Sequence, residues 1–535
     1  MSSIRLLDCT LRDGGYVNNW NFGYSTTICI VERLAEANID VIEVGFLDER
    51  QPFDRNRTIQ PDTASFDKIL TGVDTGNSML VAMIDYGTCG LDRIAPCSES
   101  VLDGIRLIFK KPKMREAVSF GRELIKLGYA VFFQMVSITS YTDRDMLDFI
   151  DLVNEVPPYA VSIVDTYGLM HKEEMLEYFF MLDRNLKPGI QIGYHSHNNF
   201  QLAYANTCEM LKKKAKHGIL VDGTAYGMGK SAGNAPIELL AMYMNENCGK
   251  SYDLNQILEI IDTNIMRIYN QQYWGYNLLY FLAASNDCHP NYIEYLLNKK
   301  TLSIKGINEV VKNIPKELKL NYNQECIEDL YVKYQNQTID SIGAMYSLQQ
   351  MFEGKPLLLL GPGKTVVSEK NLIDGYIEEK RPVIIGVNFV PTFYETDVVF
   401  ISNSKRYAMM QSDFKNIRSR ITTIATSNVT SIGNKFDYML NYAEFIDDNH
   451  FIKDNALVML LKIIQKCNPK SVALAGFDGF SEHSSDNYFS DFMEMSADFE
   501  RLAAVNQSIT KSISEFKNGT NLFFLTPSLY EQEQL

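Results

Sequence analysis

Short apolar segments rich in β-branched residues recur along the first part of the chain, with amphipathic helical patterns between them. Such nearly continuous apolar segments are typical of parallel strands that are buried on both faces. Their starts lie about 25 to 40 residues apart, which is the length of one βα unit. There are eight of them, at residues 4–9, 40–46, 79–84, 104–109, 130–136, 160–165, 191–195 and 218–222. This pattern predicts a (β/α)8 TIM barrel, with a doubly wound open sheet as the alternative.

The pattern changes twice further along the chain. Residues 251–354 show mainly helical periodicity, and the alternation of strands and helices resumes at residue 355. Apolar segments then follow at residues 356–360, 382–387, 397–401, 421–426, 471–477 and 521–525. We therefore predict a barrel domain at residues 1–250, a helical extension at 251–354, and a doubly wound, Rossmann-like α/β domain at 355–535.

Charge and cysteine content limit the classes of partner. The 535 residues include 51 lysines and arginines against 66 acidic residues, a net charge of −15, which argues against a broad nucleic-acid or anionic membrane surface. Nine scattered cysteines with no CxxC pair indicate reduced thiols, and no apolar run approaches the roughly 20 residues that span a bilayer. We expect a cytoplasmic homo-oligomer with no nucleic-acid partner and no membrane partner.

Two histidines stand at the end of the seventh predicted strand. His195 and His197 are two residues apart, so both side chains lie on one face of an extended segment and can reach one ion. Asp13, which follows the first strand, would complete a set of two histidines and one carboxylate. In a barrel, such strand ends meet at one rim, where chemistry takes place. The set suits a divalent cation: Mn²⁺ is our first expectation, with Fe²⁺, Zn²⁺ or Mg²⁺ as alternatives.

A carboxylate within the second apolar strand also needs an explanation. Glu43 would be costly to bury unless it is paired, and Arg12 at the neighbouring strand end is the natural partner. The pair could merely order the rim, or Glu43 could orient Arg12 to stabilise a developing enolate oxygen. After the eighth strand, we expect Asn234 to cap a helix with Pro236 in its first turn. Cys9 is expected to be a small buried hydrophobic residue.

Several of these motifs together resemble a known superfamily. The run from Asp8 to Gly14 (DCTLRDG), Glu43, the His195-Ser196-His197 segment and the glycines that precede Asn234 resemble the DRE-TIM metallolyases. That superfamily includes 3-hydroxy-3-methylglutaryl-CoA lyase, 2-isopropylmalate synthase and 4-hydroxy-2-oxovalerate aldolase. The resemblance covers roughly residues 1–250, and the Gly14-Gly15 pair resembles the aldolase branch most.

The resemblance implies a role for each matched residue. It implies that Asp13, His195 and His197 bind the metal with Asn234 close to it, and that Arg12 stabilises an enolate with Glu43 as its partner. Asp165, at the end of the sixth strand, would support the rim. Tyr16 stands where the aldolases have a histidine that is implicated as the base. The base could therefore be Tyr16, a metal-bound water, His289 or Tyr292.

The last third of the chain gives weaker signals. A strand at 357–360 runs into Gly361-Pro362-Gly363-Lys364-Thr365, but the first glycine of a P-loop would fall at Leu358, so the motif does not match. A strand, a glycine turn and a helix can still form an anion site. Together with glycines near residues 386 and 476, the pattern loosely resembles sialyltransferase-like domains of surface-polysaccharide pathways. That resemblance implies a nucleotide or nucleotide-sugar ligand for this domain.

The sequence thus predicts a divalent-metal-dependent carbon–carbon lyase, an aldolase that cleaves or forms a bond next to a small 2-oxo acid such as pyruvate. A Claisen-type acyl-CoA condensing enzyme is the second hypothesis, although Gly14-Gly15-Tyr16 lacks the glutamine-containing stretch usual in those synthases. A barrel that has lost activity and serves as a binding or scaffold protein is the third. A purely structural role would not need Arg12, Asp13, Glu43 and both histidines together.

Overall fold

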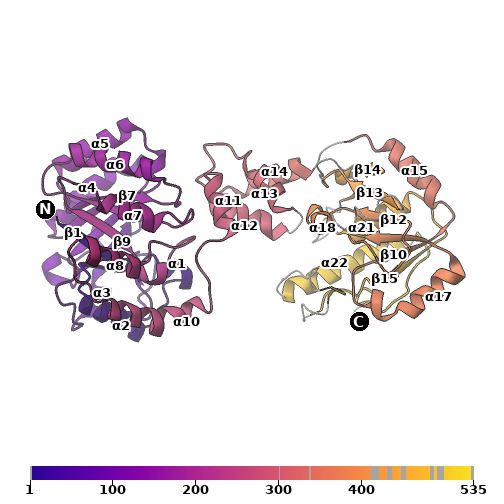
Figure 1. Cartoon of the computed structure of the whole chain (residues 1–535), viewed down its shortest axis with the longest axis horizontal. Coiled ribbons are helices and arrows are strands. Elements are labelled where there is room, and N and C mark those ends of the chain that lie inside the picture. Colours follow the sequence, from indigo (N-terminus) through magenta and orange to yellow (C-terminus); the bar gives the residue numbers. More distant parts are fainter. Residues whose placement is uncertain are drawn as a thin grey trace. The chain divides into compact units, whose positions relative to one another are not determined.

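A computed structural model of the chain describes residues 3–299, 302–335, 339–410, 421–429, 436–446, 454–481, 487–490, 499–517 and 519–531. The chain divides into two compact units, Met1–Pro290 and Asn291–Leu535. Figure 1 shows the first unit in indigo to pink and the second in salmon to yellow. Each unit has its own hydrophobic core and is described by itself.

Eight parallel strands form a closed barrel at the centre of the first unit (Figure 1). They are β1 (Ile4–Asp8), β2 (Val41–Leu47), β4 (Met79–Asp85), β5 (Gly104–Phe109), β6 (Ala130–Met135), β7 (Ala160–Asp165), β8 (Gln191–Ser196) and β9 (Ile219–Gly223). β1 pairs in parallel with both β2 and β9, which closes the ring. The predicted barrel is confirmed, since an open sheet would leave two edge strands. A short strand that was not predicted, β3 (Ile59–Gln60), pairs with β2.

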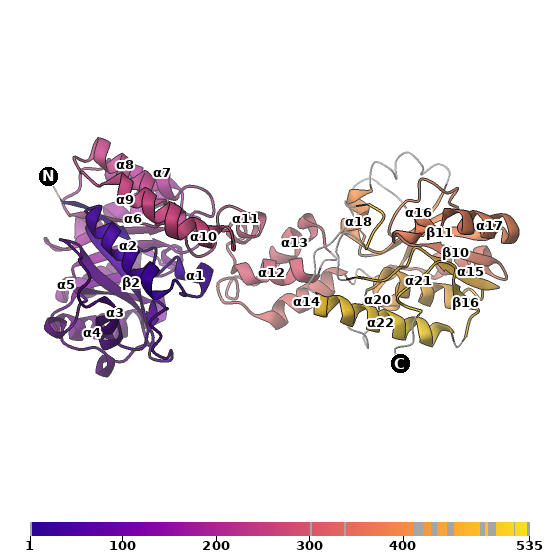
Figure 2. The same ribbon diagram turned by 90° about the horizontal axis from the view of Figure 1, so that it is seen from below.

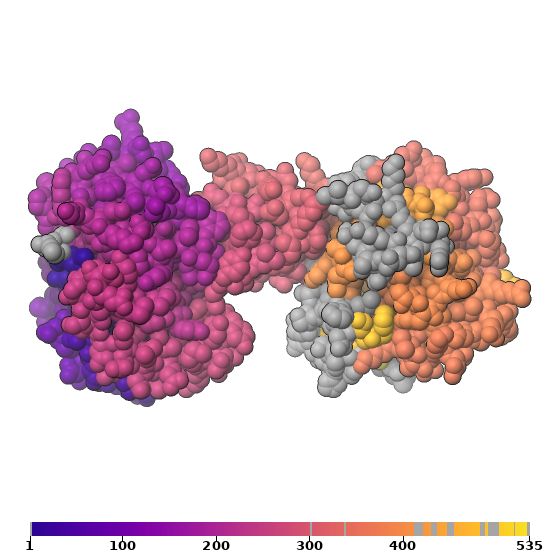
Figure 3. Space-filling view, viewed as in Figure 1, coloured from indigo at the N-terminus to yellow at the C-terminus, as the bar shows by residue number. Residues whose placement is uncertain are grey.

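Amphipathic helices surround the barrel, and segments coloured from indigo to pink share its surface in Figure 3. They are α2 (Tyr24–Glu36), α3 (Thr63–Leu70), α4 (Met114–Lys126), α5 (Asp143–Glu155), α6 (Lys172–Asn185), α7 (Ala203–Leu211) and α8 (Ile237–Asn247). The N-cap of α8 is Pro236, so the prediction that Asn234 caps this helix is wrong. The side chain of Asn234 instead donates a hydrogen bond to Asp13, which competes with the capping role.

The interior of the barrel is layered because alternate residues of each strand point inward. Near the amino-terminal ends of the strands, the inward residues are apolar and buried: Leu7, Val41, Val81, Phe132, Ala160 and Leu220. Two residues further along, the inward residues of β2, β6, β7 and β9 are polar and buried: Glu43, Gln134, Ser162 and Asp222. The apolar layer closes the bottom of the barrel. The polar layer lies beneath the strand ends, where barrels bind substrates.

The first unit continues beyond the barrel with α9 (Leu254–Ile260), a π-helical turn at Ile261–Ile265, α10 (Met266–Tyr269) and α11 (Leu278–Ser285). α9 lies beside α2, as Figure 2 shows, and Arg33 Nη1 donates to Gln256 Oε1 at 2.8 Å between them. In the described part of the chain, no helix is both long and apolar enough to cross a membrane.

The second unit combines helices with a seven-stranded parallel sheet. The helices α12 (Pro290–Lys299), α13 (Ile304–Val311), α14 (Gln324–Gln335) and α15 (Ile342–Phe352) come first, as the helical pattern predicted. The sheet has the order β14-β13-β12-β11-β10-β15-β16. Its strands are β10 (Pro356–Leu360), β11 (Val383–Val387), β12 (Val398–Ile401), β13 (Thr422–Thr426), β14 (Tyr438–Leu440), β15 (Ser471–Ala475) and β16 (Leu522–Phe524). Of these, only β14 was not predicted.

Hydrophobic cores on both faces of this sheet confirm the doubly wound architecture. Leu357 and Leu359 of β10 belong to one core, which includes residues of α15, α21 (Ala456–Gln465) and α22 (Phe499–Lys517). Leu358 and Leu360 belong to the other core, with residues of α16 (Thr365–Ser368), α17 (Lys370–Lys380) and α18 (Ser404–Met409). Both faces of the strands are therefore covered, which explains why their sequences are apolar throughout.

Candidate active site

The turn after β1 carries Arg12 and Asp13. The amides of both residues donate to the carbonyl oxygen of Cys9, at 3.2 and 2.8 Å, so the chain folds back tightly at the strand end. Trp20 Nε1 donates to the carbonyl oxygen of Arg12 at 2.8 Å. These bonds fix the backbone from which both charged side chains enter the barrel.

The glycine pair that follows is explained by close packing around this turn. A Cβ atom on Gly14 would lie 2.3 Å from the carbonyl oxygen of Thr10. A Cβ atom on Gly15 would lie 2.0 Å from Trp20 Cδ1. Any larger residue at either position would push the turn apart, and with it Arg12 and Asp13.

Six buried side chains form a closed ring of ion pairs and hydrogen bonds at the strand ends. Glu43 Oε2 accepts from Arg12 Nε and from Arg106 Nη1, both at 2.8 Å. Arg106 Nη2 donates to Asp222, and Arg12 Nη1 donates to Asp13. His195 closes the ring, with Nδ1 3.0 Å from Asp222 Oδ2 and Nε2 3.5 Å from Asp13 Oδ2. Acidic and basic groups therefore alternate around the ring in the order Asp13, Arg12, Glu43, Arg106, Asp222 and His195.

The ring gives the site its rigidity. An isolated buried charge costs several kcal/mol, whereas here each charge lies between opposite charges or beside an imidazole. Glu43 and Arg106 have no exposed surface. Arg12 is 4% exposed and its buried Nη2 has no hydrogen-bond partner among the described residues. Arg12 therefore has a donor left for a substrate, whereas Arg106 supports the ring from below.

Both histidines turn the same nitrogen toward Asp13. His195 Nδ1 faces the Asp222 carboxylate, and His197 Nδ1 lies 3.2 Å from the carbonyl oxygen of Lys230. Nδ1 must therefore carry the proton in each neutral ring, which leaves Nε2 as the acceptor. The Nε2 atoms of His195 and His197 lie 3.5 and 4.0 Å from Asp13 Oδ2.

The pKa shifts follow from burial and from these partners. Burial lowers the pKa of both histidines, but hydrogen bonds to Asp13 and Asp222 outweigh it for His195 and raise its pKa overall. For His197 burial prevails, and the pKa falls to about 4. Burial raises the pKa of Asp13, but Arg12 and then the histidines hold it well below its usual range. At neutral pH, Asp13 is thus a carboxylate and His197 is neutral, which are the states in which they bind metals.

These residues fit the predicted metal site. Asp13, His195 and His197 offer ligand atoms that all lie within 4.8 Å of one another. Asn234 Nδ2 donates to Asp13 Oδ1 at 2.9 Å, and its buried Oδ1 has no hydrogen-bond partner in the described chain. A buried polar atom without a partner is costly unless a ligand satisfies it. Two imidazoles, a carboxylate and an amide oxygen are a donor set that suits a divalent cation.

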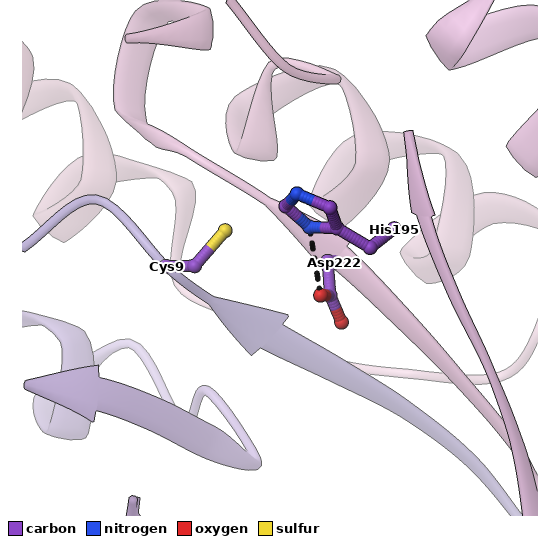
Figure 4. Close-up of side chains that lie close together, drawn as sticks. All are labelled: Cys9, His195 and Asp222. Carbon is purple, nitrogen blue, oxygen red and sulfur yellow. Dashed lines mark hydrogen bonds and ion pairs between the residues drawn. The ribbon is translucent and has the colours of Figure 1, made fainter. Parts of the chain in front are cut away.

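A second group of possible ligands, Cys9, His195 and Asp222, is less suitable (Figure 4). Asp222 already receives hydrogen bonds from His195 Nδ1 and from Arg106, whose positive charge would oppose a cation. Burial raises the pKa of Cys9 well above its usual range, and its Sγ donates to the carbonyl oxygen of Gly223 at 3.4 Å. Cys9 is a buried neutral thiol, as predicted.

Tyr16 lies at the edge of the site, on α1 (Gly15–Asn18), and is 42% exposed. Its ring packs edge-on against Trp20 with centroids 4.8 Å apart, and Lys230 Nζ lies 5.4 Å from its centroid. Burial, and then Asp13, raise the pKa of Tyr16 to about 12. Its hydroxyl is therefore protonated at neutral pH and can donate a hydrogen bond, but it is a poor base.

The other two candidate bases differ in position. His289 belongs to the barrel unit, and burial, followed by Lys230 and Lys110, lowers its pKa, so its imidazole is neutral at pH 7. Tyr292 belongs to the second unit, where its hydroxyl donates to the carbonyl oxygens of Leu318 and Asn321 at 2.9 Å each. His289 is thus influenced by Lys230, a residue of this site.

The structure thus brings together Arg12, Asp13, Glu43, His195, His197 and Asn234, and places Tyr16 beside them. Arg106 was not predicted from the sequence, and neither Asp222 nor Lys230 was expected to have a role. Arg106 could have been found in the same way as Glu43, since it is a charged residue within an apolar strand. Lys230 gave no such signal, because lysines in glycine-rich loops are usually solvated.

These observations define the first unit as a (β/α)8 barrel whose strand-end face carries three buried residues, Asp13, His195 and His197, that could hold a divalent metal ion. Residues 3–263 match the protein family described as HMGL-like. The 4-hydroxy-2-oxovalerate aldolase of Geobacillus thermodenitrificans is 26% identical over 256 residues, which are 46% of this chain and 71% of the aldolase. The match covers the barrel region, in which the resemblance to this superfamily was noted, and spans slightly less than half of the chain.

Two further proteins show how far the similarity extends. The 2-isopropylmalate synthase of Sulfurisphaera tokodaii is 28% identical over 268 residues, which are 47% of this chain and 64% of the synthase. The crystal structure of the HMG-CoA lyase from Brucella melitensis is 14% identical, covers 50% of this chain and 99% of the lyase, and has a TM-score of 0.40. The chain is therefore similar both to an aldolase and, at comparable identity, to a 2-isopropylmalate synthase.

Proposed function

We propose that the barrel is a divalent-metal-dependent aldolase that cleaves or forms a carbon–carbon bond next to a small 2-oxo acid. The observation that carries this proposal is the convergence of Asp13, His195 and His197 beside the unpartnered Nη2 of Arg12. A metal site and a fixed cation side by side are what a reaction through a 2-oxo acid enolate needs. Similarity to 4-hydroxy-2-oxovalerate aldolases supports the proposal of an aldolase reaction.

The metal would be held by Asp13, His195 and His197, with the amide oxygen of Asn234 available to it. When bound, a divalent cation supplies a Lewis acid that polarises the 2-oxo group of the substrate. The chain orients the ligands by itself: Asp222 holds the ring of His195, and the Lys230 carbonyl holds that of His197. We propose Mn²⁺ first, with Mg²⁺ or Zn²⁺ as alternatives, because the mixed nitrogen and oxygen donors suit all three.

Arg12 would stabilise the negative charge that develops on the enolate oxygen. Its guanidinium is held by Glu43 and Asp13, so it needs no reorganisation when the charge appears. Its Nη2 is left to donate to the substrate. Glu43 acts through Arg12, as a positioning residue. Preorganised donors of this kind contribute about 3 to 4 kcal/mol to the transition state.

Proton transfer would use the groups at the rim. The neutral imidazole of His289 can accept a proton at pH 7, and its lowered pKa keeps it neutral. The Tyr16 hydroxyl remains protonated and can donate to a substrate oxygen or to a leaving alkoxide. We therefore propose Tyr16 as a proton or hydrogen-bond donor and His289 as the base.

The test combines metal content with enolisation. Elemental analysis of the wild type and of a His195→Ala/His197→Ala variant is paired with exchange of solvent deuterium into the methyl group of pyruvate. We expect near-stoichiometric metal and measurable exchange in the wild type, and loss of both in the variant. Arg93→Met, which changes an exposed ion pair, serves as the matched control variant. Wild type that neither retains metal nor exchanges deuterium would refute the proposal.

A Claisen-type condensing enzyme is the second candidate, because 2-isopropylmalate synthases are among the relatives at comparable identity. It shares the metal and the enolate chemistry but requires an acyl-CoA. Release of free thiol from acetyl-CoA in the presence of a 2-oxo acid would identify it. An aldolase would leave the thioester intact.

For the second unit we keep the proposal of a nucleotide or nucleotide-sugar ligand at the strand ends of its sheet, where doubly wound folds bind ligands. The glycine turn after β10 is not the place for its phosphate, because Asp478 Oδ2 already accepts from the amide of Thr365 at 2.9 Å. Thermal-shift measurements of the chain with nucleotides and nucleotide sugars test the proposal, and the absence of any shift would count against it. Homo-oligomer formation also stays a prediction.

A further inference from the structure

The ammonium group of Lys230 lies in the site without a partner of its own. No carboxylate in the described part of the chain forms an ion pair with it, whereas half-buried Lys111, Lys213, Lys250 and Lys299 are each paired with a carboxylate. Its backbone is strongly held: its amide donates to Asp13 Oδ1 at 2.9 Å, and its carbonyl accepts from His197 Nδ1 at 3.2 Å. Its Nζ lies 5.4 Å from the centroid of the Tyr16 ring. Lys230 is therefore placed by the same contacts that place the metal ligands.

A second cation, Lys110, lies on the same face of the barrel; it is exposed and forms no ion pair with any residue that the structure describes. Lys110 directly follows β5, which stands opposite β9 in the closed ring of strands. Lys230 belongs to the loop after β9, so the two lysines approach the mouth of the barrel from opposite sides. Burial lowers the pKa of Lys230, Asp13 raises it, and Arg12 and Lys110 lower it further, which agrees with these charged groups lying around one space. Asp85, at the end of β4, shares this space with both lysines and with the ion pair of Arg50 and Asp48, whose two charges cancel.

The net charge of the site indicates what kind of ligand the two lysines would bind. The ring holds three carboxylates against the two guanidinium groups of Arg12 and Arg106. A divalent cation and the single carboxylate of a 2-oxo acid would bring this ring to neutrality. The two lysines against Asp85 then leave one positive charge at the mouth that nothing in the ring offsets. A site arranged in this way is complementary to one more negative charge.

We infer that Lys230, assisted by Lys110, binds a second anionic group of the substrate, a carboxylate or a phosphate carried on the part of the molecule beyond the 2-oxo acid. This inference rests on the proposed function and narrows its substrate class. The aldehyde half of the substrate is then an anionic aldehyde, and neutral aldehydes such as acetaldehyde are poor partners. Arg12 would bind the enolate oxygen, so the two lysines would select the aldehyde half of the substrate at the mouth of the barrel.

The first test is binding of inorganic phosphate to the metal-free protein, followed by isothermal titration calorimetry. We expect Lys230→Met to weaken phosphate binding at least tenfold, and Lys230→Arg to retain it. Lys126→Met is the matched control, because Lys126 lies at the end of α4 and pairs with Glu123 on the surface. Its phosphate affinity should equal that of the wild type. Equal phosphate affinity of the wild type and Lys230→Met would overturn the inference, and so would a wild type that binds no phosphate.

The second test uses the metal-loaded protein and compares deuterium exchange at C3 of 2-oxoglutarate, of 2-oxo-4-phosphonobutanoate and of neutral-tailed 2-oxohexanoate. The wild type should prefer an anionic tail at least tenfold in kcat/KM, and Lys230→Met should lose this preference mainly through KM. The preferred tail distinguishes a carboxylate from a phosphate. If none of the three compounds exchanges but phosphate binding depends on Lys230, the proposed function fails and the anion site stands. If 2-oxohexanoate exchanges as well as the others in the wild type, the anion site fails and the enolate chemistry stands.

Discussion

Arg106 is the residue whose replacement should disturb this protein most. Its guanidinium has no exposed surface and donates to Glu43 at 2.8 Å, to Gln134 at 3.2 Å and to Asp222. Arg106→Met keeps much of the side-chain volume but removes the positive charge between two buried carboxylates. Glu43 would retain Arg12, and Asp222 would retain His195. Breaking a buried ion pair costs about 3 to 5 kcal/mol, and we expect a loss of unfolding free energy in that range.

Urea denaturation followed by tryptophan fluorescence can measure this loss in the whole chain. The protein has only two tryptophans, Trp20 and Trp274, and both belong to the barrel unit, so the signal reports the unfolding of that unit. Arg93→Met is the matched control. Arg93 is half-exposed and lies 3.7 Å from Asp92, an arrangement that contributes at most about 1 kcal/mol.

The loss should also depend on pH. In the wild type, burial raises the pKa of Asp222, but Arg106 and His195 outweigh burial and lower it overall. A lowered carboxyl pKa contributes stability above the ordinary value and loses it as the pH falls through the folded-state value. Without Arg106 the pKa of Asp222 should rise, so the variant should regain part of its stability between about pH 7 and pH 5 as that carboxylate takes up a proton. A loss equal to that of Arg93→Met, or one that does not change with pH, would refute this reasoning.

Two further predictions concern single residues of the barrel. Arg12→Ala should retain the metal, measured by elemental analysis, but lower pyruvate deuterium exchange by about 10² to 10³-fold; a metal-loaded, folded and fully active variant would rule out its role. Asp165 has its pKa raised from 3.8 to about 7, mainly by burial and against amide hydrogen bonds from Leu169 and Met170. Such a group contributes stability below its ordinary pKa and loses it as the pH rises through about 7, so the wild-type barrel should lose up to about 4 kcal/mol of unfolding free energy between about pH 4 and pH 8. Asp165→Asn should flatten this dependence in urea titrations, and an identical pH profile for both proteins would contradict the assignment.

The strands of the barrel could be read from the sequence because burial on both faces leaves a simple signal. Each of the eight predicted segments differs from its observed strand by no more than two residues at either end. The two strands that were missed, β3 and β14, contain two and three residues. Segments of that length are too short to show a period. Their formation depends on the neighbouring strands β2 and β13, with which β3 and β14 pair.

That the three candidate metal ligands lie together could also be predicted, because strand ends of a closed parallel barrel must meet at one rim. Asp13 follows β1, whereas His195 and His197 both lie at the end of β8, and the predicted fold alone brings these two strand ends together. The pairing of Glu43 with Arg12 followed from the cost of burying a charge. Both inferences needed only the order of the strands and the polarity of the residues at their ends.

The tertiary structure decided the rest. Arg106 is a single charge in an apolar strand, and the sequence does not show that β5 faces both Glu43 and Asp222 across the barrel interior. The same holds for Asn234, which the local pattern placed at a helix cap and which instead donates to Asp13, 221 positions away in the chain. Local patterns report which residues are buried, because burial depends on the strand or helix a residue belongs to. The pairing of charged residues depends on which side chains point inward from strands that are far apart in the sequence. Only the closed barrel determines which of these side chains face one another.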